Sequence, residues 1–210
     1  GIPSVEEERL KEYEYLKDKL DFRDGIPYTP KWTAEPDFLR IIVDHCLQAE
    51  PSSVLECGSG LSTLMLARCC QMNGRGHVVS LEDGEKYSMD TTEYIERYGL
   101  TQYASVIHAP LKKISLGSNE YLWYSRKEIP DYPIEMLIVD GPSGYLQKNS
   151  RYPALPVFYP LLARSCRVFL DDAARPDEQE ILELWRSDYP DLVQTRTNAV
   201  RGCVTLSRGE

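Results

Sequence analysis

The stretch SVLECGSGLSTLMLA, residues 53–67, combines a short apolar run, a turn with two glycines and an apolar segment of helical length. A strand that ends in a glycine turn and leads into a helix is typical of open α/β sheets, in which ligands bind beyond the carboxyl ends of the strands. Gly58 and Gly60 directly follow the predicted strand, and the acidic Glu56 lies just before them. The stretch therefore predicts a ligand site at this turn, and other features must indicate which ligand it holds.

Apolar runs of strand length alternate with segments of helical length along most of the chain. We predict strands at SVLEC, HVVSLE, ASVIHA, IEMLIVD and CRVFLDD, and helices at about 61–72, 85–98, 120–128, 154–163 and 177–187. Nearly continuous apolar strands between helices indicate a parallel sheet covered on both faces. The last two runs, LVQTRTN and GCVTLSR, are joined by a short connection, so we expect the last strand to be antiparallel. The fold class is therefore α/β, with a Rossmann-like, mostly parallel sheet.

The N-terminal part of the chain precedes this alternation. Ser4 and Glu7 have the spacing of a capping box and predict a charged helix from about 5 to 20. The segment DGIPYTPKW, rich in Pro and Gly, ends this helix, and a further helix is expected at about 35–49. A length of 210 residues suits one α/β domain and is short for two. We expect an N-terminal helical extension over 1–33 and one domain over 34–210.

Composition excludes several classes of partner. The formal net charge is −9, from 24 Lys and Arg against 33 Asp and Glu, which argues against binding to a phosphate backbone. No apolar run has the roughly 20 residues that a membrane span needs, and the first residues are acidic rather than basic. The 6 cysteines form no CxxC pair, which favours reduced thiols. We expect a cytoplasmic protein that binds no nucleic acid and has no membrane span.

The charges near the glycine turn favour one kind of cofactor. The chain has no GxxxxGK[ST] pattern, which excludes a P-loop, and Thr63 stands where a dinucleotide fingerprint has Gly or Ala. Glu56 would repel a pyrophosphate, whereas it would attract the ammonium and sulfonium groups of S-adenosylmethionine. Glu82 ends the second strand, at the spacing of an acidic residue that binds ribose hydroxyls. The alternative is that both glutamates are solvated strand-end residues.

Several segments together resemble class I S-adenosylmethionine-dependent methyltransferases. VLECGSGLST is similar to their first motif, VVSLE to the second-strand motif and IEMLIVDGP to the fourth-strand motif, and the resemblance spans about residues 34–206. YTPKWTAEPDFL, RYPALP and FLDDAARPDE further resemble small bacterial methyltransferases related to those that modify sugars and other hydroxyl-bearing natural products. The resemblance implies a seven-stranded sheet whose last strand is antiparallel.

The same resemblance implies roles for the residues around the turn. Glu56 and Gly58 would lie near the methionine part of the cofactor, Gly60 near the sulfur, and His108 or Ala109 near the adenine. The full set that we expect to bind the cofactor is Glu56, Gly58, Gly60, Ser62, Glu82, Asp83, Ala109 and Asp140.

Three aspartates follow two further strands of the predicted sheet. Asp140 ends the fourth strand, and Asp171 with Asp172 ends the fifth, so all three should emerge at the edge that holds the glycine turn. Three carboxylates suit Mg²⁺, which could orient a diol acceptor. This pattern resembles metal-dependent catechol and sugar O-methyltransferases, although Ser143 stands where catechol-type enzymes have a lysine base. The alternative is that one aspartate caps the next helix and the other is solvated.

The remaining candidates concern the acceptor. Asp140, His108 and Tyr145 are the residues that we expect to take part in catalysis, and the general base is open among His108, Tyr145 and a carboxylate such as Asp172. Two arginines either orient an acceptor or are surface or salt-bridging residues, and a set of aromatic residues either forms a platform for the acceptor or packs in the core: Arg151, Arg175, Tyr28, Trp32, Tyr121, Trp123 and Tyr124.

The function that we predict is S-adenosylmethionine-dependent methylation of an oxygen on a small hydroxylated molecule or saccharide, with Mg²⁺ as an optional cofactor. An NAD-dependent oxidoreductase and a non-catalytic S-adenosylmethionine-binding partner protein are the alternatives. The sequence leaves the oligomeric state open, and the charged N-terminal helix could form an interface.

Overall fold

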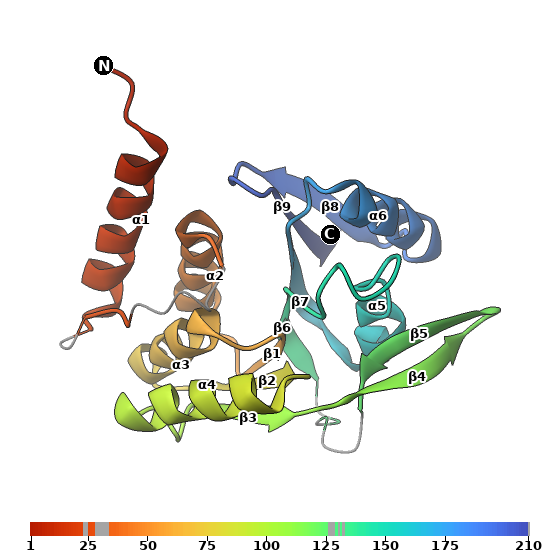
Figure 1. The fold of residues 1–210 in the computed structure, drawn as a ribbon, viewed down its shortest axis with the longest axis horizontal. Coiled ribbons are helices and arrows are strands. Elements are labelled where there is room, and N and C mark those ends of the chain that lie inside the picture. The colour runs from red at the N-terminus through yellow and green to blue at the C-terminus, as the bar shows by residue number, and fades with distance from the viewer. Residues whose placement is uncertain (23–24, 28–33, 126–128, 130, 132, 210) are drawn as a thin grey trace.

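The computed structural model describes residues 1–22, 25–27, 34–125, 129, 131 and 133–209. A seven-stranded sheet crosses the middle of the molecule and has helices on both faces (Figure 1). Its strand order is β3-β2-β1-β6-β7-β9-β8, and the strands are β1 (Ser53–Cys57), β2 (His77–Glu82), β3 (Ala104–His108), β6 (Ile134–Val139), β7 (Leu162–Asp171), β8 (Leu192–Thr197) and β9 (Cys203–Arg208). The five neighbouring strands β3, β2, β1, β6 and β7 pair in parallel. Strand β9 pairs antiparallel with both β7 and β8. The predicted Rossmann-like fold with an antiparallel last strand is confirmed.

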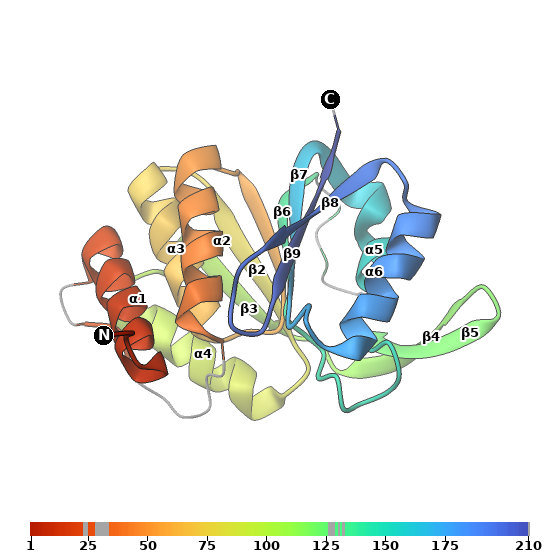
Figure 2. The same cartoon turned by 90° about the horizontal axis from the view of Figure 1, so that it is seen from above.

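Two layers of helices bury the two faces of the sheet, as Figure 2 shows from above. On one face lie α2 (Pro36–Ala49), α3 (Leu61–Asn73) and α4 (Glu85–Arg97), whose apolar side chains pack with Val54, Val78 and Met136 of the sheet. On the other face lie α5 (Ala154–Phe158) and α6 (Pro176–Asp188), which pack with Leu55 and Leu137. Since neighbouring residues of a strand point to opposite faces, these buried apolar strands supply both cores.

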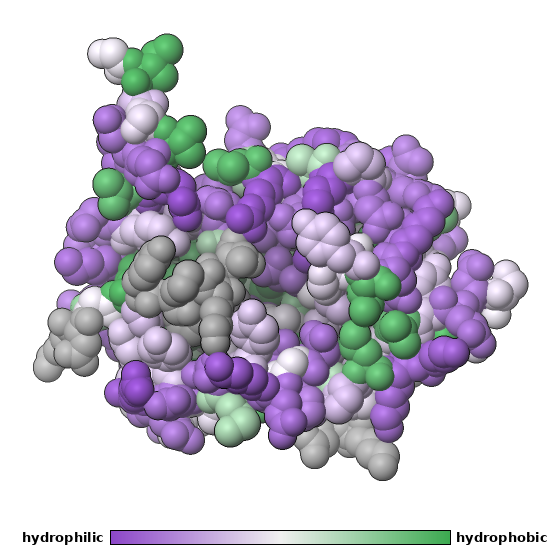
Figure 3. Space-filling model, in the orientation of Figure 1, coloured by the Kyte–Doolittle hydropathy of each residue, from purple (hydrophilic) through white to green (hydrophobic). Residues whose placement is uncertain are grey.

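Helix α1 (Val5–Leu20) lies outside α2 and α3. The Ser4 hydroxyl accepts a hydrogen bond of 3.2 Å from the backbone N–H of Glu7, which supports the predicted start of the helix. Leu16 and Leu20 are fully buried, whereas the N-terminal end of the helix exposes its apolar side chains, which gather at one end of the molecule in Figure 3. The division of the chain at residue 33 stays a prediction, because residues 28–33 lie outside the described part.

Two predicted helices are wrong in part. The first part of the helix expected at about 120–128 is instead a strand, β5 (Asn119–Tyr124). This strand pairs with β4 (Leu111–Leu116) in an antiparallel hairpin. Gly117 and Ser118 make its two-residue turn, and Gly117 has a φ of +62°, as the first residue of a tight hairpin turn often does. The helix expected at 154–163 is only α5 followed by one 3₁₀ turn (Tyr159–Leu161), because β7 already begins at Leu162.

No helix in the described part of the chain is long and apolar enough to cross a bilayer.

Candidate active site

A cleft of about 930 Å³ opens where β1, β2, β6 and β7 end. Its walls come from the turns that follow these four strands, which is where a parallel sheet of this type binds ligands. Most of the predicted site residues line it: Gly58, Gly60, Ser62, Glu82, Asp83, Asp140, Tyr145 and Asp172. The structure therefore brings the glycine turn and two of the three aspartates to one cavity.

The glycine loop, Gly58 to Gly60, leads from β1 into α3. Gly58 has a φ of +92°, and a Cβ there would lie 3.4 Å from the backbone carbonyl carbon of Asp140. Glycine is therefore favoured by the left-handed backbone conformation, whereas the distance to the loop after β6 is an ordinary van der Waals contact. The hydroxyl of Thr63 accepts a hydrogen bond of 3.1 Å from the N–H of Gly60. The loop is thus held in a fixed shape at the N-terminal end of α3, which faces the cleft.

Glu56 lies beneath the glycine loop rather than in the cleft. Its side chain is fully buried and accepts hydrogen bonds from the hydroxyls of Ser62, Thr63 and Ser80, the last at 2.9 Å. Burial raises the pKa of this carboxyl group to about 7, although the three hydroxyl donors act in the opposite direction. Glu56 therefore connects β1, β2 and the first turn of α3 from below the glycine loop. The expected position near the ligand differs, because this side chain does not line the cleft.

Glu82 connects the glycine loop to the end of β2 and also lines the cleft. Its Oε1 accepts hydrogen bonds from the N–H of Ser59 at 3.1 Å and from the Ser59 hydroxyl at 2.7 Å, and its Oε2 accepts one from the N–H of Gly84 at 3.1 Å. A carboxylate has about four acceptor positions, so acceptor capacity remains on the cleft side. The neighbouring Asp83 is exposed at the rim.

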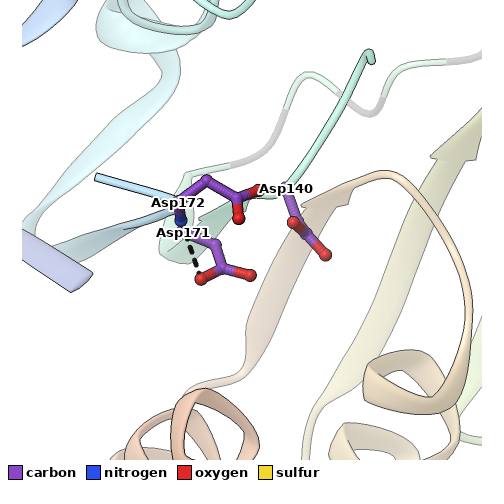
Figure 4. Close-up of side chains that lie close together, drawn as sticks. All are labelled: Asp140, Asp171 and Asp172. Carbon is purple, nitrogen blue, oxygen red and sulfur yellow. Dashed lines mark hydrogen bonds between the residues drawn. The ribbon is translucent and has the colours of Figure 1, made fainter. Parts of the chain in front are cut away.

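Asp140, Asp171 and Asp172 form an aspartate cluster at the other end of the cleft (Figure 4). One carboxylate oxygen of each lies within 4.8 Å of the others. Asp171 is buried, with Oδ1 accepting a hydrogen bond of 2.8 Å from the N–H of Asp172 and Oδ2 having no partner among the described residues. Burial raises the pKa of Asp171, and repulsion from Asp140 and Asp172 raises it further. The cluster thus concentrates negative charge in a partly dry place.

The guanidinium group of Arg151 is buried beside this cluster. It donates hydrogen bonds to the backbone carbonyls of Asp140 at 3.1 Å, Pro142 at 3.2 Å and Asp171 at 3.3 Å. It also donates to Oδ2 of Asp172 at 3.1 Å, and one of its nitrogens lies 3.9 Å from Oδ1 of Asp140. Arg151 therefore joins the ends of β6 and β7 and offsets part of the charge of the aspartate cluster.

The aspartate cluster fits a small divalent cation. Its three carboxylates are the hard oxygen ligands that Mg²⁺ prefers. Oδ2 of Asp171, buried without a partner, is an acceptor that a bound cation would satisfy. Arg151 and Arg175 supply positive charge, but Arg175 also forms an ion pair of 2.9 Å with the buried Glu178. Negative charge on the cluster thus remains for a ligand to offset.

Other predicted residues lie away from the cleft or at its edge. His108 is exposed at the end of β3, and Ala109 is buried behind it; neither is among the described residues that line the cleft. The reason is that β3 is the edge strand of the sheet, one strand beyond β2. Tyr145 is 96% exposed at the rim of the cleft.

The aromatic candidates divide in the same way. Tyr124 lines the cleft, whereas Trp123 is buried in the core and Tyr121 packs against the ring of Tyr152 at 5.6 Å. Tyr28 and Trp32 lie outside the described residues.

Sequence reasoning missed three supporting residues. Ser80 is a hydroxyl inside an otherwise apolar strand, and that contrast could have indicated a buried acceptor such as Glu56. Ser59 was passed over between two glycines, although it binds Glu82. For Arg151 the sequence left open an acceptor role and a surface or salt-bridging role. The structure shows a buried ion pair with Asp172, which follows from the packing of its loop against the ends of β6 and β7.

Comparisons with known proteins agree with this geometry. A sequence model described as "Methyltransferase domain" matches residues 55–173, which is more than half of the chain. No curated protein matches the chain.

Solved structures share the fold at low sequence identity. The methyltransferase PaMTH1 of Podospora anserina, bound to S-adenosylhomocysteine, has a TM-score of 0.63 and 15% identity, over 100% of this chain and 90% of that one. The O-methyltransferase of Bacillus cereus, also in complex with S-adenosylhomocysteine, has a TM-score of 0.60 and 18% identity, over 99% and 93%. TomG of Streptomyces achromogenes, an O-methyltransferase of tomaymycin synthesis in complex with S-adenosylmethionine, has a TM-score of 0.60 and 13% identity, over 96% and 90%. The chain therefore belongs to the methyltransferase domain family and has the Rossmann-like fold of the class I S-adenosylmethionine-dependent enzymes.

Proposed function

We propose that this protein transfers the methyl group of S-adenosylmethionine to an oxygen of a small hydroxylated molecule or saccharide. The observation that carries the proposal is the shared cleft: the glycine loop with Glu82 lies at one end of it and the aspartate cluster at the other. A methyl donor and an oxygen acceptor could thus meet in one cavity, which is what an in-line displacement requires.

Each end of the cleft has the chemistry for one reactant. Backbone N–H groups at the start of α3 and the carboxylate of Glu82 suit the polar parts of the cofactor, namely its carboxylate and its ribose hydroxyls. Asp140 follows β6, which lies between β1 and β7 in the sheet, so it stands between the glycine loop and the other two aspartates. We assign to Asp140 the positioning of the acceptor hydroxyl, and propose no separate residue as the base.

Asp140, Asp171 and Asp172 would hold Mg²⁺ if the protein uses a metal. The ion, when bound, would lower the pKa of an acceptor hydroxyl and help to orient a second oxygen of the acceptor. Arg151 would keep the two strand ends in place whether or not the ion is bound, because most of its hydrogen bonds go to backbone carbonyls.

The two alternatives explain fewer observations. A dinucleotide would bring a pyrophosphate close to a loop with Glu56 beneath it and Glu82 and Asp83 beside it, which is unfavourable for an anion. A non-catalytic partner protein would have no need of the aspartate cluster at the acceptor end. Cytoplasmic location and the absence of a nucleic-acid partner stay predictions.

Calorimetric titration of the purified chain with S-adenosylhomocysteine tests the proposal, with NADH as the competing ligand. We expect saturable binding of S-adenosylhomocysteine, a loss of about tenfold or more in Glu82→Ala, and no binding of NADH. Glu85→Ala is the matched control, since this glutamate is exposed and lies three residues further along, outside the described cleft residues. Absent binding of S-adenosylhomocysteine to the unmodified chain would remove the methyltransferase assignment.

The oxygen acceptor is tested next with radiolabelled S-adenosylmethionine and a panel of saccharides and phenols, with and without Mg²⁺. Label should transfer to hydroxyl-bearing compounds, and Asp140→Asn should lower the rate by at least about tenfold. Transfer to amines or thiols alone would contradict O-methylation.

A further inference from the structure

Tyr124 brings an unusual hydroxyl to the cleft. It ends β5 of the hairpin, its side chain is 1% exposed, and it is one of the residues that line the cleft. Its hydroxyl has no hydrogen-bond partner among the described residues. Buried hydroxyls of tyrosine usually find a partner, so an unpartnered one at the wall of a ligand cleft needs an explanation.

The position of the hydroxyl is fixed by the loop after β6. A Cβ built on Gly141 would lie 2.4 Å from Oη of Tyr124, 3.3 Å from the carbonyl oxygen of Cys57 and 3.3 Å from Cα of Gly58. The Tyr124 hydroxyl thus points to the place where the loop after β6 meets the start of the glycine loop. It can approach so closely only because residue 141 is a glycine.

The hydroxyl lies beside the start of the glycine loop, since the Cβ position of Gly141 that it approaches also lies 3.3 Å from Cα of Gly58. Cys57, Asp83 and Glu82, from the ends of β1 and β2, are the groups that raise the pKa of Tyr124 most after burial, and Arg151 acts in the opposite direction. Asp171 and Asp172 are not among these main influences. The hydroxyl stays protonated and is free to donate a hydrogen bond.

A phenylalanine would serve the packing equally well. The ring of Tyr124 contacts Trp123 edge-on, with centroids 5.0 Å apart, and this contact does not involve the hydroxyl. An unsatisfied buried hydroxyl lowers stability. The hydroxyl of Tyr124 is therefore explained by a hydrogen bond to a ligand that binds in the cleft. The indole nitrogen of Trp123 also lacks a partner, but Trp123 does not line the cleft.

We propose that the hydroxyl of Tyr124 donates a hydrogen bond to the adenosine half of the cofactor and thereby contributes to recognition of S-adenosylmethionine. The proposal rests on the function proposed above. The acceptors in this half of the cofactor are the ring nitrogens of adenine and the ribose oxygens. Glu82 and Asp83, which line the same cleft as Tyr124, suit the ribose hydroxyls. The homocysteine half carries its charges nearer the N-terminus of α3.

The test compares the unmodified chain with Tyr124→Phe by calorimetry, using S-adenosylhomocysteine and 5′-methylthioadenosine, which contains only the adenosine half. We expect Tyr124→Phe to weaken binding of both ligands by the same factor, roughly 3- to 10-fold. Tyr121→Phe is the matched control because it removes the same atom from the same strand outside the described cleft lining. Without ligand, Tyr124→Phe should melt at the same temperature as the unmodified chain or higher, because it removes an unsatisfied hydroxyl.

The outcomes separate this proposal from the proposed function. If S-adenosylhomocysteine does not bind to the unmodified chain, the proposed function fails, and this proposal fails with it. Equal binding to the unmodified chain and to Tyr124→Phe would overturn the role of Tyr124 alone. A loss for S-adenosylhomocysteine but not for 5′-methylthioadenosine would overturn the assignment to the adenosine half.

A second measurement keeps the hydroxyl of Tyr124 in place. The chain is labelled with 3-fluorotyrosine, and the fluorine resonance missing from labelled Tyr124→Phe is assigned to Tyr124. Saturation with 5′-methylthioadenosine should shift this resonance, and an unchanged resonance would contradict the proposed contact.

Discussion

At the glycine-loop end of the cleft, the chain itself supplies partners for Glu56 and Glu82, whose oxygens accept hydrogen bonds from hydroxyl and amide donors. At the aspartate end, Asp171 keeps a buried oxygen that has no partner among the described residues, although Arg151 lies close by. A carboxylate with donors on both oxygens helps to shape a loop, whereas one with an unsatisfied oxygen in a buried place lowers stability until a ligand arrives. The difference indicates that the first end is built in advance and that the second is completed by what it binds.

The largest expected effect on the free energy of unfolding tests how far the charge of Arg151 offsets the negative charge of the aspartate cluster. Arg151→Met keeps most of the side-chain volume but leaves three carboxylates without their buried cation. We expect a loss of about 3–5 kcal/mol in the free energy of unfolding, as for other broken buried ion pairs. Urea unfolding measures it. Lys148→Met, in which the lost ion pair to Glu180 is largely exposed, should cost less than about 1 kcal/mol. Equal effects of the two substitutions would show that Arg151 is not the main compensating charge.

The next effect uses pH to examine Glu56. The pKa of Glu56 is raised to about 7 in the folded protein, above the value of about 4.3 in an unfolded chain. Between these values the folded protein binds more protons than the unfolded one, so the free energy of unfolding falls as pH rises, by up to about 3 kcal/mol. Unfolding curves from pH 4 to pH 8 should show this slope reduced in Glu56→Gln. Glu96→Gln, at an exposed position, should leave the slope unchanged.

The features that sequence could predict are those that the sheet positions by itself. Gly58, Glu82, Asp140 and Asp172 follow ends of parallel strands, and such ends meet at one edge whatever the helices do. Strands β1, β2 and β6 can be predicted from the sequence because burial on both faces leaves a continuous apolar run.

The features that the sequence left open, or did not predict, depend on contacts between distant segments. Arg151 reaches the cluster from a loop after β6, and Tyr124 reaches the cleft from a hairpin that interrupts the strand-helix alternation. Lys112 and Lys113 interrupt the alternation of apolar and polar residues in β4. The sequence signal for the hairpin is therefore its two turn residues, Gly117 and Ser118. Burial of Glu56 could not be read from its position before the glycines, because the hydroxyls that hold it come from α3 and β2.

A smaller effect concerns Gly141, where the two ends of the cleft meet. Gly141→Ala would place a Cβ 2.4 Å from the hydroxyl oxygen of Tyr124, so we expect a loss of about 1–3 kcal/mol through overpacking. Combining it with Tyr124→Phe should recover part of the loss, because the oxygen that clashes is gone. Urea unfolding of the two single variants and the double variant gives the coupling. Strictly additive effects would contradict the contact between the two side chains.

The smallest expected effect comes from replacing one carboxylate at each end of the cleft, Asp171 and Glu56, by the corresponding amide. Asp171→Asn keeps the acceptor for the N–H of Asp172 and removes repulsion within the aspartate cluster, so the ion-free protein should gain about 1 kcal/mol. At pH 4, where Glu56 is neutral in the folded protein, Glu56→Gln should instead lose about 1 kcal/mol, because an amide NH₂ replaces an oxygen that accepts hydrogen bonds from hydroxyl donors. Millimolar Mg²⁺ should raise the melting temperature of the unmodified chain and of Glu56→Gln but not that of Asp171→Asn, since binding to the folded state alone stabilises it. If both substitutions destabilise the ion-free protein, Asp171 belongs to the structural carboxylates like Glu56, and the proposed difference between the two ends of the cleft is wrong.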